Sequence, residues 1–599
     1  GAKLVLDLGA GTGILSMLAC RAPASSCRAV ACEAYGACAT LAERVVAKNG
    51  LADRVRVVSK VASDLEVGVD LPERADLCVF ELFDSQLLGE SILPILRDAQ
   101  ARLLVPNAIM VPRSVGIRAV VVECVALASA DLPEIRGAPW PMMLSELGLF
   151  GDDIAILPLT EVWQAAGIDF SDLPSLGPNV ATASPKAIAS GTAHAVAWWW
   201  ELDMGGGTSH SSWTPKGTSN GSAAARHHWR PCLSFVEPRG VKAGSTLQIS
   251  AVHDDDAVWF AWHDPGSTTV PPRWVEGVTT IPPERERLLL AASAAFAGSL
   301  GRAAAALADA SSGQNHEVLL LPAEDGLLLP ALASALSAPG VSGSTALIPA
   351  RTGRRLMEEG RLPGDLKLLA GASSVQLQPP PSVLVVEPFS PAAVLPWELA
   401  LDCRRRVDAV KSMVADDVLV LPSVVRFLAV VVECSSAWLA RQPLPDDICG
   451  LDLSEANASL LPRRSMPLEC HLCELPWRPL SAPTEVLRLG LREAGTAWRG
   501  SCELLATAAG ACHAAVVWAE FGLGAGPTAV WLGTGPPPPG GAPNGWSQAM
   551  QLVDVPFSVS VGEPAADVHL DFSVAGAVRL AVAPSDAEDG SRRKRLRQA

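Results

Sequence analysis

Residues 4–20 read LVLDLGAGTGILSMLAC, and this stretch predicts how the first part of the chain folds. The apolar run 4–8 is typical of a buried strand, whereas residues 14–20 have the apolar spacing of a helix. Three glycines lie between them at alternate positions: Gly9, Gly11 and Gly13. A backbone that turns sharply and approaches a ligand at a helix N-terminus has no room for side chains, so the pattern predicts a ligand-binding loop.

Acidic residues at two strands indicate the class of ligand. Asp7 lies in the first strand, and a second predicted strand, residues 29–32, ends in Glu33, which accepts hydrogen bonds from ribose hydroxyls if the ligand is a nucleoside. A helix over residues 37–49 and a third strand over residues 55–59 follow. The GxGxG spacing fits S-adenosylmethionine better than NAD. An NAD-dependent oxidoreductase is disfavoured because no hydride-transfer site is evident after this region.

The segment ELFDSQLLGE, residues 81–90, carries the candidate catalytic pair. It follows the apolar run Ala75–Phe80, so Glu81 lies where a predicted strand ends, and Glu90 follows nine positions later. Two carboxylates joined by a short turn could close on one guanidinium, which is planar, forked and permanently charged. In the alternative interpretation, Glu81 only ends the strand and Glu90 only opens the next helix.

Composition limits the class of protein. A chain of 599 residues is too long for one core and suggests about four domains. Hydrophobic residues make up 49% and charged residues 18%, which indicates a globular chain. No uninterrupted apolar segment is long enough to span a bilayer. A net charge of −16 argues against direct nucleic-acid binding and suits a cationic peptide substrate. Fourteen scattered cysteines without a secretory signal favour a reducing compartment.

The second half of the chain repeats the first. Residues 105–124 align with residues 415–434 without a gap, and both segments end in AVVVEC. Trp199 and Glu201 align with Trp518 and Glu520. A period near 310 residues is too long for a solenoid and indicates one fused duplication.

The two copies differ where chemistry is expected. The counterpart of the glycine loop, residues 319–329, keeps only Gly326 and adds two acidic residues. In the counterpart of the glutamate segment, Glu387 remains and Glu398 stands in an altered setting. The second copy is therefore predicted to be a structural partner and not a second catalyst.

Together these segments resemble the protein arginine methyltransferases, in particular the tandem-repeat branch. The matching pieces are VLDLGAGTGILSM, Glu33, ELFDSQLLGE, AWWWELDM, the HHW element at residues 227–229 and VHDDDAVWF. The resemblance implies an α/β plus β fold: a Rossmann-like S-adenosylmethionine-dependent domain, then a β-barrel with a helical insertion, the unit being duplicated as a degenerate intramolecular pseudodimer. The implied domains are 1–112 and 113–270, a linker at 271–285, a degenerate copy at 286–422 and 423–584, and a basic tail at 585–599.

The resemblance also implies roles for individual residues. The cofactor, S-adenosylmethionine, would be held by Asp7, Gly9, Gly11, Gly13 and Glu33. The catalytic residues would be Glu81, Glu90 and His228, and the substrate-binding residues Asp84, Gln86 and Trp229. The expected reaction is type III, giving monomethylarginine in arginine-containing proteins such as histones or RG-rich proteins. A pseudo-methyltransferase scaffold that binds partners without turnover is the non-enzyme alternative.

Several features depart from the family or stay open. In the family, helices that precede the first strand fold over the cofactor. This sequence begins after them, so the chain is expected to bind S-adenosylmethionine poorly. Gln86 stands where the branch carries a glutamate, which should weaken the preference for arginines flanked by basic residues. No metal site is predicted, although Cys449, Cys470 and Cys473 are either ordinary thiols or zinc ligands. The RRKRLR tail is either a nuclear-import signal or a solvated end, so the expected location is cytoplasmic, nuclear or both.

Overall fold

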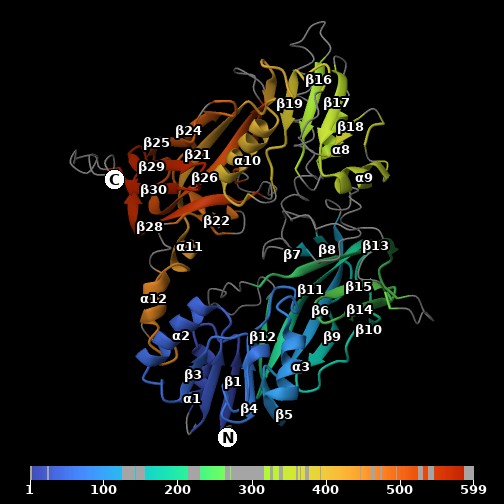
Figure 1. Ribbon diagram of the computed structural model, residues 1–599, viewed down its shortest axis with the longest axis vertical. Helices are drawn as coiled ribbons and strands as arrows, with labels where there is room; N and C mark the ends of the chain where they lie inside the picture. The colour runs from blue at the N-terminus through green and yellow to red at the C-terminus, as the bar shows by residue number, and fades with distance from the viewer. Residues whose placement is uncertain are drawn as a thin grey trace. The chain divides into compact units, whose positions relative to one another are not determined.

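The computed structural model divides the chain into two compact units, Gly1–Pro282 with Pro443–Pro462, and Pro283–Gln442 with Arg463–Ala599. Within the described residues, each unit contains a parallel sheet, a larger antiparallel sheet and a three-stranded sheet (Figure 1). The structure describes residues 3–22, 26–124, 142–143, 156–213, 229–263, 270–271, 316–323, 328–335, 341–358, 360, 362–364, 366–370, 377–390, 393–445, 447–460, 466–472, 475–493, 495–523, 530–536 and 546–585.

The first parallel sheet has the strand order β3-β2-β1-β4-β5. Its strands are β1 (Leu4–Leu8), β2 (Arg28–Cys32), β3 (Val55–Val58), β4 (Ala75–Phe80) and β5 (Leu104–Val111). The connecting helices are α1 (Ile14–Arg21), α2 (Gly36–Lys48), the short 3₁₀ helix η1 (Ala62–Asp64) and α3 (Ile92–Arg102). The chain reverses its direction across the sheet between β1 and β4, and ligands of such sheets bind beyond the carboxyl ends of the strands at this point.

Both faces of this sheet are covered, which explains why its strands are almost continuously apolar. Val5 of β1 packs with Met17 of α1 and Val45 of α2 on one face. Leu6 packs with Leu96 of α3 on the other face, in a core that continues into the antiparallel sheet. All five residues of β1 are buried, so this strand fixes the glycine loop on a rigid support.

The antiparallel strands of the first unit centre on β6 and β11, which pair along most of their length. The sheet contains β6 (Ser114–Cys124), β7 (Met142–Met143), β8 (Ile156–Pro158), β9 (Trp163–Asp169), β11 (Gly191–Gly205), β12 (Thr208–Ser211) and β13 (Cys232–Val241). A smaller sheet contains β10 (Asn179–Ala183), β14 (Ile249–His253) and β15 (Val258–Trp262). The Arg97 guanidinium on α3 donates two 2.9 Å hydrogen bonds to the Asp255 carboxylate, which ties this smaller sheet to the parallel domain.

Two short strands form where the sequence does not predict a strand. Met142 and Met143, predicted within a helical insertion, form strand β7 because they pair with the edge of β13; residues 144–155 lie outside the described part of the chain. Thr208–Ser211, in a stretch rich in Gly, Ser and Thr, form β12 because the glycines at 205–207 adopt positive φ and turn the chain back onto β11. The predicted linker at 271–285 and the basic tail also fall almost entirely outside the described residues.

The second unit has the parallel strand order β18-β17-β16-β19-β20, the same order as the first. Its parallel domain contains β16 (His316–Leu321), α8 (Leu329–Ala335), β17 (Val341–Leu347), α9 (Ala350–Glu358), β18 (Lys367–Leu369), β19 (Val383–Val386), α10 (Pro396–Ala409) and β20 (Leu419–Leu421). The antiparallel strands are β21 (Val424–Glu433), β22 (Leu468–Cys470), β23 (Arg478–Pro479), β24 (Thr484–Gly490), β25 (Ala497–Leu505), β26 (Gly510–Leu523), β27 (Val530–Gly533), β28 (Gln548–Val559), β29 (Pro564–Ser573) and β30 (Val578–Pro584). The helix α11 (Ser435–Leu439) follows β21.

The two large antiparallel sheets have the same strand order, and an equivalent side-chain hydrogen bond occurs in each of them. The Cys124 N–H at the end of β6 donates to His194 Nδ1 on β11 at 3.0 Å. The Cys434 N–H after β21 donates to His513 Nδ1 on β26 at 3.3 Å. These are residues that the sequence alignment places opposite each other, so the aligned segments occupy the same register in both sheets.

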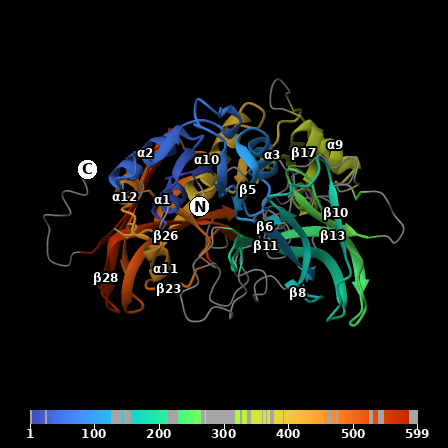
Figure 2. The same ribbon diagram turned by 90° about the horizontal axis from the view of Figure 1, so that it is seen from below.

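One segment of the second half belongs to the first unit. The described part of residues 443–460, including helix α12 (Ser454–Leu460), packs on α1 and α2, as both views of the chain show (Figure 2). Leu451 and Leu453 are buried in the same cluster as the residues of these helices. The Asn49 side chain donates to the Asp452 carbonyl and accepts from the Asp452 N–H, both at 2.8 Å. Apolar burial and paired hydrogen bonds therefore hold this segment on the outer face of the first domain.

Candidate functional site

The glycine loop follows β1 and has an open face. Gly9, Gly11 and Gly13 all have positive φ, at 74°, 54° and 78°, a conformation that favours residues without a side chain. The N–H groups of Gly9 and Ala10 donate to the Cys32 carbonyl at 3.0 and 2.9 Å, which ties the loop to the end of β2. A Cβ at Gly11 would meet nothing within 4 Å, so the space above this residue can accept a ligand.

Glu33, which follows β2, lies beside this loop. Its Oε2 accepts the Gly11 N–H at 2.8 Å, and its Oε1 accepts the Tyr35 N–H at 2.7 Å. The side chain is half-buried, and each carboxylate oxygen can accept a further hydrogen bond. These residues therefore fit a cofactor that presents vicinal hydroxyls near an open glycine loop.

Asp7 lies beneath the loop and is fully buried. Its Oδ2 accepts the backbone N–H of Ser16 at 3.0 Å and the hydroxyl of Ser16 at 2.7 Å. Burial raises the pKa of Asp7 to about 6, and the negative charge of Glu33 contributes to the increase. Asp7 Oδ1 is buried and has no hydrogen-bond partner among the described residues. Asp7 thus fixes the first turn of α1 under the glycine loop.

The glutamate loop, residues 81–90, begins at the same edge of the sheet. Phe80 of β4 and Cys32 of β2 both lie opposite Leu8 of β1, so the residues that follow them end three adjacent strands. The Glu81 carbonyl oxygen would lie 3.8 Å from a Cβ at Gly9, and Glu81 is exposed. Glu90 is also exposed, at the far end of the loop. The fold therefore brings Glu81 to the glycine loop and Glu33.

Hydrogen bonds within the glutamate loop give it a defined shape. Asp84 Oδ1 accepts the Gly89 N–H at 3.2 Å, and the Asp84 carbonyl accepts the Leu87 N–H at 3.0 Å. A Cβ at Gly89 would lie only 2.2 Å from Asp84 Oδ2, so a glycine is needed there. Burial raises the pKa of the Asp84 carboxyl. Asp84, predicted to contact substrate, therefore stabilises the loop through hydrogen bonds within it. Gln86, the second predicted substrate residue of the loop, is half-buried.

The loop also contains backbone that L-residues rarely adopt. Leu87 has φ 73° and Ser91, just before α3, has φ 59°. Leu87 is fully buried, so the surrounding core holds it in this conformation. Such residues are energetically unfavourable and concentrate at functional sites, where the rest of the structure fixes them.

Two tryptophans, Trp200 on β11 and Trp229 just before β13, donate hydrogen bonds to the backbone of the loop. Trp229 Nε1 donates to the Phe83 carbonyl at 2.7 Å, and Trp200 Nε1 donates to the Asp84 carbonyl at 3.2 Å. The two indoles pack edge to face with centroids 4.7 Å apart. Trp229, a predicted substrate residue, is buried, and His228 lies outside the described residues. Trp200 was not among the residues predicted from the sequence. The alignment of the two copies sets it against Ala519, and this difference could have marked Trp200 as a candidate.

The corresponding carboxylates of the second unit accept hydrogen bonds from backbone N–H groups. Glu387, which follows β19, is fully buried, and its Oε2 accepts the Ala323 N–H at 2.8 Å. Glu398 Oε2 accepts the N–H groups of Val394 and Leu395 at 2.7 and 2.9 Å, which caps helix α10. Neither glutamate has the exposure of Glu81 and Glu90.

The remaining candidate features are a metal site, the cysteines and a membrane-spanning helix. In the part of the chain that the structure describes, no group of three or more His, Cys, Asp and Glu side chains could hold a metal ion. Cys449 is exposed and Cys470 is half-buried, and Cys473 lies outside the described residues. No helix among the described residues is long and apolar enough to cross a membrane.

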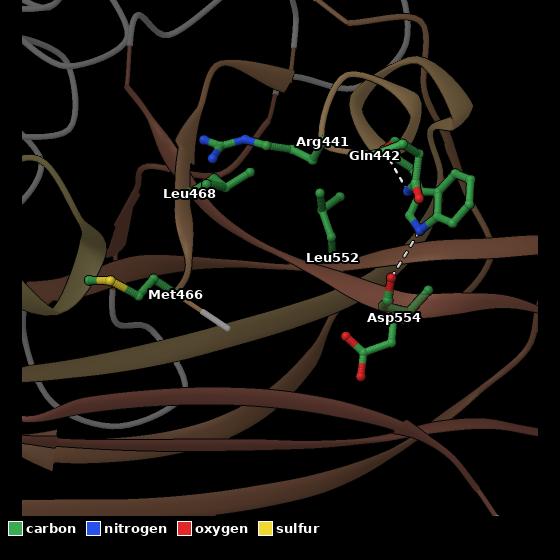
Figure 3. A pocket seen from close by; sticks show the side chains of 8 residues that line it. Arg441, Gln442, Met466, Leu468, Leu552 and Asp554 are labelled. Atoms are coloured by element: carbon green, nitrogen blue, oxygen red, sulfur yellow. Dashed lines mark hydrogen bonds between the residues drawn. The ribbon is translucent and has the colours of Figure 1, made fainter. Parts of the chain in front are cut away.

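A small hollow lies in the second unit (Figure 3). It is lined by Trp438, Arg441, Gln442, Met466, Leu468, Leu552, Val553 and Asp554. Figure 3 shows Arg441 above Leu468 on one side and Asp554 on the other. None of the predicted site residues lines this hollow.

Comparisons with known proteins agree with the motifs. No protein-family model matches the chain. The chain is 28% identical over 568 residues to protein arginine N-methyltransferase 7 of Xenopus laevis, covering 87% of this chain and 80% of the relative. The proteins of the same name from Gallus gallus and Drosophila grimshawi are 28% identical over 564 residues and 26% identical over 584 residues, each covering 87% of this chain and 80% and 79% of the relatives.

Among solved structures, the Trypanosoma brucei PRMT1 enzyme-prozyme heterotetrameric complex with AdoHcy covers 42% of this chain and 78% of its own, at 19% identity and a TM-score of 0.34. The sequence relatives extend across both copies of the repeat, since their matches cover 87% of the chain. The predicted resemblance is confirmed: along most of its length, the chain is similar to protein arginine N-methyltransferase 7.

Proposed function

We propose that this protein transfers a methyl group from S-adenosylmethionine to a guanidino nitrogen of arginine in protein substrates. The observation that carries the proposal is the gathering of the glycine loop, Glu33 and exposed Glu81 at one edge of the parallel sheet. The relatives named for arginine methylation match across 87% of the chain and support the same reaction.

The first domain would hold the cofactor. Gly9 and Gly11 provide a backbone surface without side chains, and Glu33 provides carboxylate oxygens for hydroxyl donors. When bound, S-adenosylmethionine supplies a methyl group that its sulfonium has already activated. The protein therefore has to position and polarise the acceptor, and it has little covalent chemistry to perform.

Glu81 and Glu90 are proposed to bind the guanidinium. Carboxylate–guanidinium pairs are charge-assisted and often bidentate, so two carboxylates can fix both the plane and the direction of the acceptor group. Their charges would concentrate electron density on the attacking nitrogen and favour the arrangement in which positive charge moves onto the acceptor. Trp229 supports the loop that carries both residues, and His228 is proposed as a further substrate-side residue.

The finer assignments belong to the same proposal. The product would be monomethylarginine, as expected of a type III enzyme, and the second unit would be a non-catalytic copy that completes an intramolecular pseudodimer. The domain boundaries given above and the barrel form of the antiparallel strands are part of this proposal. The burial of Glu387, the capping role of Glu398 and the packing of the described part of residues 443–460 on the first unit support it.

Mass spectrometry of an arginine- and glycine-rich peptide incubated with S-adenosylmethionine and the full chain tests the proposal. Glu81→Gln is the test variant, and Glu73→Gln is a matched control because Glu73 is an exposed glutamate of the same domain. The expected result is monomethylarginine that is lost in Glu81→Gln and kept in Glu73→Gln. Dimethylarginine would contradict the type III assignment. Binding of S-adenosylhomocysteine without methylation of any peptide would instead favour a scaffold.

A further inference from the structure

Trp200 makes an unusual contact with the middle of the glutamate loop. It lies in β11 and is fully buried, and its indole Nε1–H donates to the Asp84 carbonyl at 3.2 Å. The ring packs against two other aromatic side chains, with centroid distances of 5.4 Å to Phe83 and 4.7 Å to Trp229. The contact therefore joins a side chain of the antiparallel sheet to backbone that lies between Glu81 and Glu90.

The Asp84 carbonyl oxygen accepts two hydrogen bonds that determine the shape of this loop. The same oxygen accepts the Leu87 N–H at 3.0 Å, and Leu87 is the residue with φ 73°. The Asp84 side chain accepts the Gly89 N–H, so backbone on both sides of Leu87 depends on the position of Asp84. Because left-handed backbone at a leucine is unfavourable, contacts that fix Asp84 keep the turn from relaxing.

The second unit shows the same framework without this indole. Trp200 lies opposite Ile117 on β6, and Ala519 lies opposite Phe427 on β21. The gapless alignment sets Ile117 against Phe427, so Ala519 is the counterpart of Trp200. The chain thus contains its own comparison between a tryptophan and an alanine at one register position.

The glutamate loop and its counterpart in the second unit differ in their aromatic packing and in the exposure of the first glutamate. In the second unit, Phe389 stacks directly on Trp546 with centroids 4.3 Å apart and ring planes at 24°. Glu387 is fully buried on the Ala323 N–H, whereas Glu81 in the first unit is exposed. Where alanine replaces the indole, the two remaining aromatic rings stack on each other, and the glutamate after the strand turns into the core.

We propose that Trp200 is a positioning residue that holds the glutamate loop in the form that presents Glu81. The indole ring packs against both Phe83 and Trp229, and its N–H donates to the Asp84 carbonyl. The consequence for catalysis rests on the proposed methyltransferase function, whereas the effect on the loop conformation does not.

Trp200→Phe tests the N–H alone because it keeps an aromatic ring, and Trp200→Ala copies the second unit. Trp199→Phe is the control, since Trp199 is the neighbouring buried tryptophan and packs on Trp213 instead of on the loop. For Trp200→Phe we expect kcat to fall about fivefold to tenfold, the change that loss of one buried hydrogen bond produces, with the KM for S-adenosylmethionine unchanged. Trp200→Ala should lose more activity than Trp200→Phe.

Hydrogen exchange of the loop provides a readout that does not need activity. The amides of Leu87 and Gly89 should exchange about fivefold to tenfold faster in Trp200→Phe and at the wild-type rate in Trp199→Phe. Equal exchange in both variants would overturn the proposal even if methylation is observed. Faster exchange in a protein that never methylates would support the positioning role and reject the proposed function.

Discussion

Asp7 should make the first unit less stable at neutral pH than in mild acid. Its carboxyl is fully buried and accepts hydrogen bonds only from Ser16 among the described residues, through one of its two oxygens. Burial raises its pKa from 3.8 to about 6. The folded state therefore binds the proton more tightly than the unfolded chain, so stability falls as the pH rises from about 4 to about 6.

The size of this effect follows from the pKa difference. A shift from 3.8 to about 6 corresponds to about 3 kcal/mol at pH 7, because one pKa unit is worth about 1.4 kcal/mol. Asp7→Asn keeps an acceptor for Ser16 and removes the charge. The variant should therefore be more stable than wild type by about 3 kcal/mol at pH 7 and by only about 1 kcal/mol at pH 4.5, where wild-type Asp7 is protonated in the folded state.

Hydrogen exchange of the β1 amides under denaturant gives the free energy of unfolding of the first unit separately from the second. Asp70→Asn is the opposite control. The hydrogen bond from the Lys60 ammonium lowers the pKa of Asp70, so its contribution is present at neutral pH and is lost as the pH falls. An Asp7→Asn difference that is constant between pH 4.5 and pH 7 would refute the reasoning, and so would a variant less stable than wild type at pH 7.

Three further outcomes are expected. Gly9→Ala should weaken S-adenosylhomocysteine binding at least tenfold by calorimetry, because a Cβ there would lie 2.6 Å from a Leu82 methyl group; a Kd unchanged from wild type would contradict this. A double-mutant cycle on Arg97 and Asp255 should give a coupling energy of about 1 kcal/mol that falls with salt, since both side chains are partly exposed; a salt-independent value would reject the ion pair. Leu453→Ala should weaken the docking of its segment by about 2–4 kcal/mol through loss of apolar packing, seen as faster proteolysis near residue 445, and wild-type resistance would contradict it.

The sequence predicted the elements that local chemistry determines. Leu4–Leu8 and Ala75–Phe80 are strands with the predicted bounds, because short apolar runs flanked by polar residues specify buried strands. The glycine loop also has the expected positive φ, because no other residue type adopts that backbone as readily. In contrast, β7 and β12 were missed, since each is a strand only because an edge of the sheet is available for pairing.

The placement of Glu33 beside the glycine loop could also be foreseen, since parallel strands bring their carboxyl ends to one edge of a sheet. The side chains around the glutamate loop could not. The sequence names Asp84 as a carboxylate near the substrate and gives no sign that its side chain also accepts the Gly89 N–H. Likewise, Glu387 aligns with Glu81 in sequence and yet is buried where Glu81 is exposed.

By itself, the sequence determined the first strands and helices around the glycine loop, the repeat and the set of residues from which the site is built. Tertiary structure alone decided which of those side chains face outward, because that depends on contacts between residues far apart in the chain. Trp200 and Asp84 are separated by 116 positions, and the Asn49 contact with Asp452 spans 403. A local pattern of apolar and polar residues contains no information on such pairs, and only the packed core brings them to hydrogen-bonding distance.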